Sequence, residues 1–293
     1  MLTDATTLAA EFDRHRSRLI GLAYRLTGRL ADAEDAVQEA WLRLSAERSE
    51  IRELGAWLTT VVSRICLDQL RSAAVRRERY VGPWLPEPVV TGVDDPQEIV
   101  ATRDDLRMAA LRVLHELPPD QRLAFVLHDA FDVPFAEIAD VLGCAVATAR
   151  QHASRARRAM AAADPAPRTP LPEQQEVVGA FLSAVSSGDI AAITRALHPQ
   201  AVFFGDSDGA ARTARRAILG GEKIARFITG LLRKYGAGLY ADLRPALVNG
   251  DLGLVVPGGP EREARVVTFS VRDGVITEVF DIVNPDKLAH VEF

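Results

Sequence analysis

Arginine and glutamine side chains recur at helical spacing between residues 148 and 158, and they are the groups in this sequence best suited to chemistry. Each can make two hydrogen bonds to one base edge in the major groove of DNA, and arginine also neutralises phosphates. The periodicity places Arg150, Gln151 and Arg155 on one outer face. The same face also carries Ala147, Thr148 and Ser154. This face indicates recognition of double-stranded DNA, and Arg155, Arg157 and Arg158 are available to neutralise phosphates.

The residues around this face have the pattern of a helix-turn-helix. Gly143 permits the left-handed turn that ends a first short helix, and Ala145 stands where a capping Ser or Asn is expected. The predicted inner positions are Ile138, Ala139 and Leu142 in the first helix, and Ala149, Ala153, Ala156 and Met160 in the second. An ordinary helical hairpin with a solvated basic face is the alternative. The glycine turn, the small inner residues and the arginine-rich second helix favour DNA recognition.

A second group of residues is acidic and lies on a short amphipathic helix that begins near Asp32. Its outer face carries Asp32, Glu34, Asp35, Gln38 and Glu39, and Trp41 belongs to its apolar stripe. Two interpretations remain open. The charges form either a solvated face that is favourable at a helix N-terminus, or a docking surface for a basic partner.

The next predicted helix, from about Leu54 to Ala74, ends in a basic segment. Arg64, Asp68 and Arg71 share one of its sides, and Arg76, Arg77 and Arg79 follow. Intrahelical Asp–Arg pairs explain this pattern, and contact with a nucleic-acid backbone and unstacked bases explains it equally.

The overall composition limits how such a protein can bind DNA. The 293 residues carry a net charge of −5, and acidic side chains outnumber basic ones both before and after residue 162. Because an autonomous DNA-binding protein is usually basic, we expect weak binding unless a larger partner contributes contacts. We find no apolar run of membrane-spanning length and no secretion signal, and Cys66 and Cys144 read as small buried thiols, so we expect a cytoplasmic protein without a membrane contact.

Proline-rich stretches divide the chain. Residues 8–79 and 98–162 are predicted to be helical, and residues 80–97 and 163–172 are predicted linkers. After residue 172 the predicted helices are 173–187, 189–197 and 220–235, and the predicted strands are 240–249, 251–256, 264–272 and 275–283. Asn249-Gly250 and Asp273-Gly274 are favoured hairpin turns. Helices followed by an antiparallel meander predict an α+β domain.

Taken in order along the chain, these motifs resemble the extracytoplasmic-function (ECF) sigma factors over roughly residues 10–162. The segment Asp32–Leu44 is similar to region 2.2, which grips the β′ clamp of core RNA polymerase. Trp57–Arg71 resembles regions 2.3 and 2.4, which melt and read the minus-ten promoter element, although Arg64 stands where many members carry Asn. Leu117–Arg122 and the helix-turn-helix resemble region 4, which reads the minus-thirty-five element.

The resemblance implies an alternative sigma factor that brings core polymerase, through its β′ clamp and β flap, to promoter DNA. It assigns core binding to Asp32, Glu34, Asp35, Gln38, Glu39 and Trp41. It assigns minus-ten contacts to Arg64, Asp68, Arg71, Arg76 and Arg77, and minus-thirty-five contacts to Thr148, Arg150, Gln151, Ser154 and Arg155. The implied domains are region 2 at 1–79, a linker at 80–97, region 4 at 98–162, a second linker at 163–172 and a regulatory domain at 173–293.

The C-terminal part is similar to SnoaL-like domains, which have the cone-shaped α+β fold of nuclear-transport-factor-like proteins. A subgroup of ECF sigma factors carries such a fusion, and its marks here are Trp84–Pro88, Asn284–Leu288 and, in part, the loop Asp208–Arg212. The resemblance implies regulatory contacts by Trp84, Leu85, Pro86, Asp208, Gly209, Asn284, Pro285, Asp286, Lys287 and Leu288. We expect the linker and Asn284–Leu288 to lie close together and to bridge to residues 10–79.

Relatives of this C-terminal fold include enzymes that use an Asp or His in an apolar cone, so His198, Asp206, Asp208 and Asp281 are candidate bases. The alternative is that His198 and Pro199 form a helix-ending turn and that the aspartates cap loops. Because the sequence has no Ser/His/Asp order, phosphate loop or metal-ligand spacing, we expect no catalysis, cofactor or metal. A small-molecule ligand that regulates without chemistry remains open. The competing functional class is a stand-alone helix-turn-helix regulator with a ligand-sensing C-terminal domain.

Overall fold

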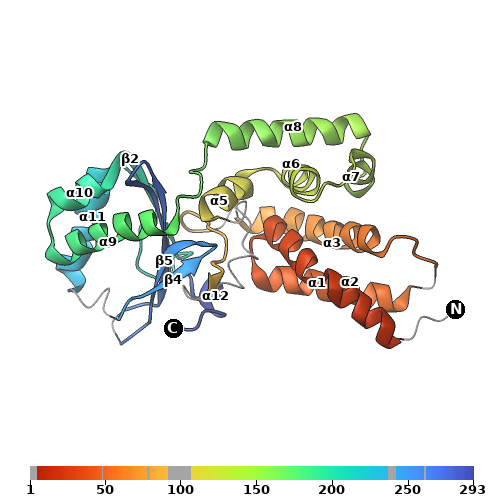
Figure 1. Ribbon diagram of the computed structural model, residues 1–293, viewed down its shortest axis with the longest axis horizontal. Coiled ribbons are helices and arrows are strands. Elements are labelled where there is room, and N and C mark those ends of the chain that lie inside the picture. The colour runs from red at the N-terminus through yellow and green to blue at the C-terminus, as the bar shows by residue number, and fades with distance from the viewer. Residues whose placement is uncertain (1–4, 48, 78–79, 92–106, 237–241, 261) are drawn as a thin grey trace. The chain divides into compact units, whose positions relative to one another are not determined.

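The structure is a computed structural model, and it describes residues 5–47, 49–77, 80–91, 107–236, 242–260 and 262–293. The chain divides into two compact units (Figure 1). The helical unit contains Met1–Arg79 and Val113–Asp164, and the C-terminal unit contains Tyr80–Arg112 and Pro165–Phe293. Helix α5 (Met108–Glu116) crosses this boundary, and the first part of the helix predicted over residues 98–116 lies outside the described residues.

The helical unit begins with three helices, α1 (Ala5–Thr27), α2 (Leu30–Ala46) and α3 (Leu54–Arg77). The Thr27 hydroxyl donates to the carbonyl of Ala23 at 2.9 Å, and Gly28 takes a φ of 71°, so α1 ends here without strain. The apolar positions of the three helices, such as Leu22, Val37 and Val62, are at most 1% exposed. Their 3.6-residue periodicity therefore builds one shared core.

The rest of this unit is α6 (Pro119–Phe125), a π-helical turn η2 (Val126–Ala130), α7 (Phe135–Leu142) and α8 (Val146–Ala163). Ala149, Ala153 and Ala156 of α8 are completely buried, which lets α8 pack closely on its neighbours. The expectation of two buried thiols is correct for Cys66 alone. Cys144 is half-buried because it directly follows Gly143 in the tight turn between α7 and α8.

The C-terminal unit is built on one mixed sheet. Among the described residues the strand order is β1-β4-β5-β6-β7-β2-β3. The strands are β1 (Val90–Thr91), β2 (Leu197–Asp206), β3 (Ile218–Leu219), β4 (Arg244–Val248), β5 (Asp251–Val256), β6 (Arg265–Arg272) and β7 (Val275–Ile282). The predicted turns join β4 to β5 and β6 to β7, with positive φ at Asn249, Gly250, Asp273 and Gly274.

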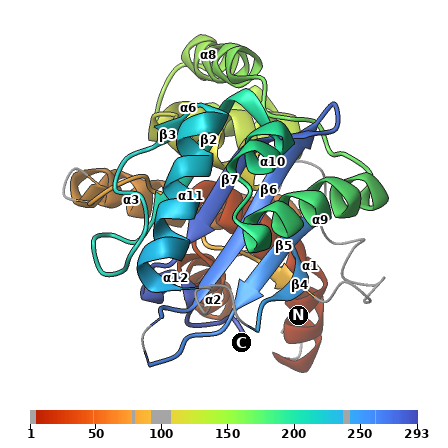
Figure 2. The same cartoon turned by 90° about the vertical axis from the view of Figure 1, so that its left-hand side faces the viewer.

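The two faces of this sheet are covered differently. Helices α9 (Leu171–Ser187), α10 (Ile190–Ala196) and α11 (Gly221–Tyr235) lie across one face, as Figure 2 shows. Phe181, Ile224 and Phe269 belong to the core on that side. On the other face, Leu85 of the linker and Met108 of α5 pack with Phe280 and with Leu288 of the short helix α12 (Pro285–Leu288). The linker is thus part of the core of the C-terminal unit.

Two features of the sheet differ from the sequence prediction. The segment after α10 is the long strand β2, so His198 and Pro199 lie in a strand and do not form a helix-ending turn. The sheet is also not purely an antiparallel meander, because β2 pairs in parallel with β7, joining Phe203 to Val279 and Asp206 to Ile282. The sequence obscured β2 because proline is unusual inside strands and because its partner lies far along the chain.

Candidate functional site

The described helix-turn-helix consists of α7, the turn at Gly143 and α8. Gly143 has a φ of 67°, and its amide and that of Cys144 both donate to the carbonyl of Ala139, which closes α7. Ala145 precedes α8 without a side-chain cap. The sharp turn therefore rests on the glycine, and it fixes the direction in which α8 leaves α7.

The outer face of α8 is accessible within the helical unit. Arg150, Gln151 and Arg155 are exposed, and Thr148 and Ser154 are half-buried. Two inner positions differ from the prediction: Val141 is buried where Leu142 was expected, and Met160 is only half-buried. Val141 lies three residues after the buried Ile138, on the same face of α7, and Met160 lies in the last turn of α8.

Helix α2 presents an acidic and partly apolar outer face. Glu34, Asp35 and Gln38 are exposed, and Asp32 and Glu39 are half-buried. Glu39 accepts from the Arg43 Nε at 2.9 Å, and Leu42 is 53% exposed beside these charges. Trp41 is half-buried and packs on Phe12 with 5.1 Å between ring centroids. This face offers carboxylates and an apolar side chain together.

Within the helical unit, the basic side of α3 touches α6 and α7. Arg71 forms an ion pair with Asp120 of α6 at 3.2 Å, and Arg64 lies 3.4 Å from the backbone carbonyl of Asp140 in α7. Asp68 is exposed. The side chains of Arg76 and Arg77 lie outside the described residues.

A buried arginine joins α6 to α1. Arg122 of α6 is 2% exposed, and its guanidinium donates to the carbonyls of Leu26 at 2.8 Å, His115 at 2.8 Å and Leu117 at 3.1 Å. The bond to Leu26 reaches the end of α1, and the other two close the turn before α6. One side chain therefore organises the turn and ties it to the first helix.

In the C-terminal unit, Asp206 at the end of β2 is the centre of a buried polar cluster. Its carboxylate is fully buried and accepts from the Tyr80 hydroxyl, from the Leu85 amide at 2.6 Å and from the Lys287 ammonium at 2.6 Å. Lys287 also donates to the carbonyl of Leu85. We call Tyr80, Leu85, Asp206 and Lys287 the linker clasp.

Neighbouring groups complete the linker clasp. The Lys287 ammonium lies 4.2 Å from the centre of the Trp84 ring and 5.1 Å from that of Tyr80, which suits a cation–π contact. Asn284 donates to the Tyr80 hydroxyl at 2.8 Å. Burial and the charge of Asp206 raise the pKa of Tyr80, so the phenol stays protonated and donates.

Further contacts hold the rest of the linker. The Val81 amide donates to the exposed Asp208 at 2.9 Å, and the Val89 amide donates to the Asn249 side chain at 3.2 Å. Residues Val90–Thr91 then extend the sheet as β1 beside β4. The linker and Asn284–Leu288 are therefore in contact, as expected, and their bridge to residues 10–79 stays a prediction. Pro86 is buried, Gly209 has a φ of 76°, and Pro285 and Asp286 are exposed.

The candidate catalytic residues do not form one site. Asp206 belongs to the linker clasp, Asp208 is exposed beside Val81, and His198 accepts from the Gln200 amide at 3.1 Å. Asp281 lies on the helix-covered face, paired with Arg265 at 3.1 Å. Across the described residues, no cluster of three or more His, Cys, Asp or Glu is arranged to hold a metal ion, and no helix is both long and apolar enough to cross a bilayer.

Sequence reasoning treated Asp206 only as a candidate base, and it assigned no contact to Tyr80 or Asn249. The linker motif Trp84–Pro88 and the segment Asn284–Leu288 were the available signals. Neither identifies the acidic partner, because Asp206 comes from a strand that the sequence did not reveal.

Comparisons with known proteins agree with the helical elements. Residues 12–76 match the family model for Sigma-70 region 2, and residues 107–160 match the model for Sigma-70, region 4. The chain is 52% identical over 288 residues to the ECF RNA polymerase sigma factor SigJ of Mycobacterium tuberculosis, covering 95% of this chain and 92% of the relative. It is 33% identical over 294 residues to a probable ECF sigma factor, SigI, of the same organism, covering 96% and 94%.

A solved structure gives the same result for the whole chain. The crystal structure of M. tuberculosis SigJ aligns with a TM-score of 0.79 at 48% sequence identity, and the alignment covers 96% of this chain and 98% of that chain. The similarity therefore includes the C-terminal unit as well as the helices.

Proposed function

Since the chain belongs to the ECF RNA polymerase sigma factors, we propose that it directs core polymerase to a specific set of promoters and that its C-terminal unit modulates this activity through the linker clasp. Sigma factors bind core polymerase and promoter DNA, and they initiate transcription without being enzymes. The observation that carries the modulation is the buried Asp206–Lys287 pair, which holds the chain between the minus-ten and minus-thirty-five segments.

Core polymerase is proposed to bind the outer face of α2. Glu34, Asp35 and Gln38 are exposed there, and Leu42 adds an exposed apolar side chain. Carboxylates around an apolar side chain suit a partner with a basic surface. We propose that this partner surface is the β′ clamp. Trp41 supports this face through its contact with Phe12.

The minus-ten element is proposed to be read by α3 after a rearrangement within the helical unit. Arg64 and Arg71 contact α7 and α6 in the free chain. The side chains of Arg71 and Asp120 are 51% and 40% exposed, so water screens their pair and its loss costs little. Promoter DNA and polymerase can therefore compete for these arginines.

The minus-thirty-five element is proposed to meet α8. Arg150, Gln151 and Arg155 are exposed along it, and arginine and glutamine can make paired hydrogen bonds to guanine and adenine. Thr148 and Ser154 lie beside them. Arg157 is engaged by Asp129 at 2.7 Å, which favours a phosphate-facing or structural role over base recognition.

The modulation follows from where the clasp lies in the sequence. Residues 80–91 follow α3 in the sequence and lead toward the minus-thirty-five segment. Because these residues are bound to the C-terminal unit, less of the linker is free to span the distance between the two DNA-binding segments. A shorter tether restricts the separations that the two DNA-binding segments can reach. The C-terminal unit would thereby set which promoter spacings are used.

Run-off transcription with purified core polymerase on candidate promoters tests the sigma assignment. We expect core-dependent initiation by the full chain, and we expect charge reversal at Glu34 and Asp35 together to abolish it while the protein remains folded. Asp13→Arg, an exposed change on α1, is the matched control. Promoter binding that needs no core enzyme, together with an absence of core-dependent initiation, would favour the stand-alone regulator.

The modulation is tested in the same assay by loosening the clasp. Lys287→Met removes the ammonium from Asp206, and Lys223→Met changes an exposed lysine of the same unit. We expect Lys287→Met to alter the ratio of transcripts from promoters of different spacing, with Lys223→Met indistinguishable from the unmodified chain. Equal ratios from both variants would contradict modulation through the clasp.

A further inference from the structure

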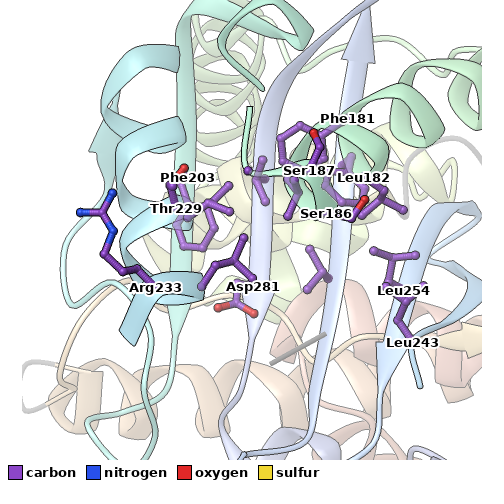
Figure 3. A pocket seen from close by; sticks show the side chains of 17 residues that line it. Phe181, Leu182, Ser186, Ser187, Phe203, Thr229, Arg233, Leu243, Leu254 and Asp281 are labelled. Atoms are coloured by element: carbon purple, nitrogen blue, oxygen red, sulfur yellow. The ribbon is translucent and has the colours of Figure 1, made fainter. Parts of the chain in front are cut away.

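A cavity of about 460 Å³ lies between the sheet of the C-terminal unit and helices α9 and α11 (Figure 3). Its lining is mainly apolar and includes Phe203 and Phe269 from the sheet and Ile228 and Leu232 from α11. Sites for small organic ligands have this size and this kind of wall. Side chains that face open space lose packing contacts, so a purely structural domain would gain stability by filling it.

The charged groups at this cavity are already neutralised or turned away. Asp281 accepts from the Thr213 hydroxyl at 2.6 Å and from the Arg265 guanidinium at 3.1 Å. In Figure 3 the guanidinium of Arg233 points away from the apolar side chains. A charged ligand would therefore lose hydration without gaining an ion pair in the cavity.

The hydroxyl groups of Thr229 and Ser187 at the cavity can still accept hydrogen bonds but cannot donate them. Thr229 donates to the carbonyl of Ala225 at 2.7 Å, and Ser187 donates to that of Ala184 at 3.0 Å. Their single protons are engaged by the helix backbone, while their oxygens can still accept. A ligand hydroxyl that donates is the polar group that these oxygens can bind.

The cavity and the linker clasp lie on opposite faces of the same two strands. Phe203 and Val279 line the cavity and are paired across β2 and β7. Three residues farther along β2, Asp206 pairs with Ile282 and holds the clasp on the other face. Side chains alternate between the faces of a strand, so a displacement of β2 or β7 by a ligand reaches the clasp directly.

We propose that this cavity binds an uncharged, mainly apolar small molecule carrying at most a hydroxyl group, and that the occupied cavity changes the hold of the clasp on the linker. The proposal deepens the proposed function, because it rests on the clasp being the modulating element. It assigns the signal to a neutral hydrophobic compound.

Binding is tested on the purified full chain with N-phenyl-1-naphthylamine, an uncharged apolar fluorophore. We expect a saturable rise in fluorescence. Leu232→Trp fills the cavity from a half-buried position, and it should weaken binding by at least about tenfold, whereas Lys223→Trp on the exposed side of α11 should not. Circular dichroism establishes that both variants are folded. An absence of saturable binding, or equal affinity of the two variants, would overturn the proposal.

A matched pair of competitors tests the preference for uncharged ligands. Decan-1-ol and decanoate have the same chain length and differ in charge at neutral pH. We expect decanol to displace the fluorophore at a concentration at least about tenfold lower, because decanoate would bring an unpaired charge to the cavity. Equal or stronger displacement by decanoate would overturn this assignment.

Hydrogen exchange of residues 80–91, with and without saturating decanol, tests the link to the clasp. We expect decanol to change exchange there in the unmodified chain and not in Leu232→Trp. Unchanged exchange in the ligand-bound chain would overturn the coupling. These measurements contain no polymerase, so their failure leaves the sigma function and the role of the clasp untouched.

Discussion

Two ion pairs in this molecule each join a basic side chain to an aspartate, one in a buried setting and one in an exposed setting. Lys287 and Asp206 are 1% and 0% exposed and are surrounded by further hydrogen bonds, whereas Arg71 and Asp120 are 51% and 40% exposed. A buried charge that loses its partner is strongly unfavourable, and an exposed one is simply rehydrated. Without a ligand the linker is therefore held firmly on the C-terminal unit, while the contact between α3 and α6 can open.

The largest expected effect comes from breaking the buried pair. Lys287→Met should lower the free energy of unfolding by about 3–5 kcal/mol, because the Asp206 carboxylate is left buried without its cation. Denaturant unfolding of the C-terminal unit measures this. Adding Asp206→Asn, which removes the charge but keeps an oxygen that can accept from the Leu85 amide, should recover part of the loss. A double variant less stable than Lys287→Met would contradict the explanation.

The second largest effect is expected in the helical unit, where Arg122 is a buried charged side chain like Lys287. Arg122→Met keeps the length of the side chain and leaves the carbonyls of Leu26, His115 and Leu117 without their donor. We expect a loss of about 2–3 kcal/mol of stability from these unsatisfied buried groups. Thermal unfolding checks this, with the exposed Arg158→Met as control. Equal melting temperatures for the two variants would show that Arg122 is not an anchor.

A third prediction concerns residues that take no part in either pair. Arg150→Ala or Arg155→Ala should weaken promoter binding by the polymerase complex by about 1–3 kcal/mol if the side chain binds a base, and should mainly reduce the salt dependence if it binds phosphate. Fluorescence anisotropy on promoter DNA at several salt concentrations separates the two. Unchanged affinity and unchanged salt dependence for both variants would mean that α8 is not the recognition helix.

The smallest effect is expected at the exposed pair. Arg71→Ala should change stability by less than about 1 kcal/mol, and a double-mutant cycle with Asp120→Ala gives the coupling energy directly. A coupling energy as large as that of the Lys287–Asp206 pair would contradict the claim that exposure makes the Arg71–Asp120 pair weak. We also expect Arg71→Ala to reduce initiation more than Asp120→Ala does, since only Arg71 is proposed to bind DNA.

The sequence predicted the elements whose signals are local. Gly143 indicated the turn between α7 and α8, and Asn249-Gly250 and Asp273-Gly274 indicated the hairpins, because positive φ values favour these residue types. The all-α segments followed by an α+β unit are confirmed. Strand β2 was missed because its parallel pairing with β7 depends on residues about 75 positions apart, as with Phe203 and Val279.

The site was predictable only where a motif marks it. The linker motif and Asn284–Leu288 pointed to each other through the resemblance, but no sequence pattern shows that Asp206 joins them. Asp206 reaches the clasp because it ends β2 on the face that the linker covers. The contact of Arg71 with Asp120 was also not predictable, because it joins two helices that lie far apart in the sequence.

The most direct test of the account is hydrogen exchange of residues 80–91 in the free chain and in its complex with core polymerase. The Leu85 amide is bound to Asp206 and the Val89 amide to Asn249. The account predicts that this segment exchanges slowly and equally in both states, because the linker clasp stays closed while the contact between α3 and α6 opens. Exchange of residues 80–91 at the rate of an unstructured peptide, in either state, would contradict it.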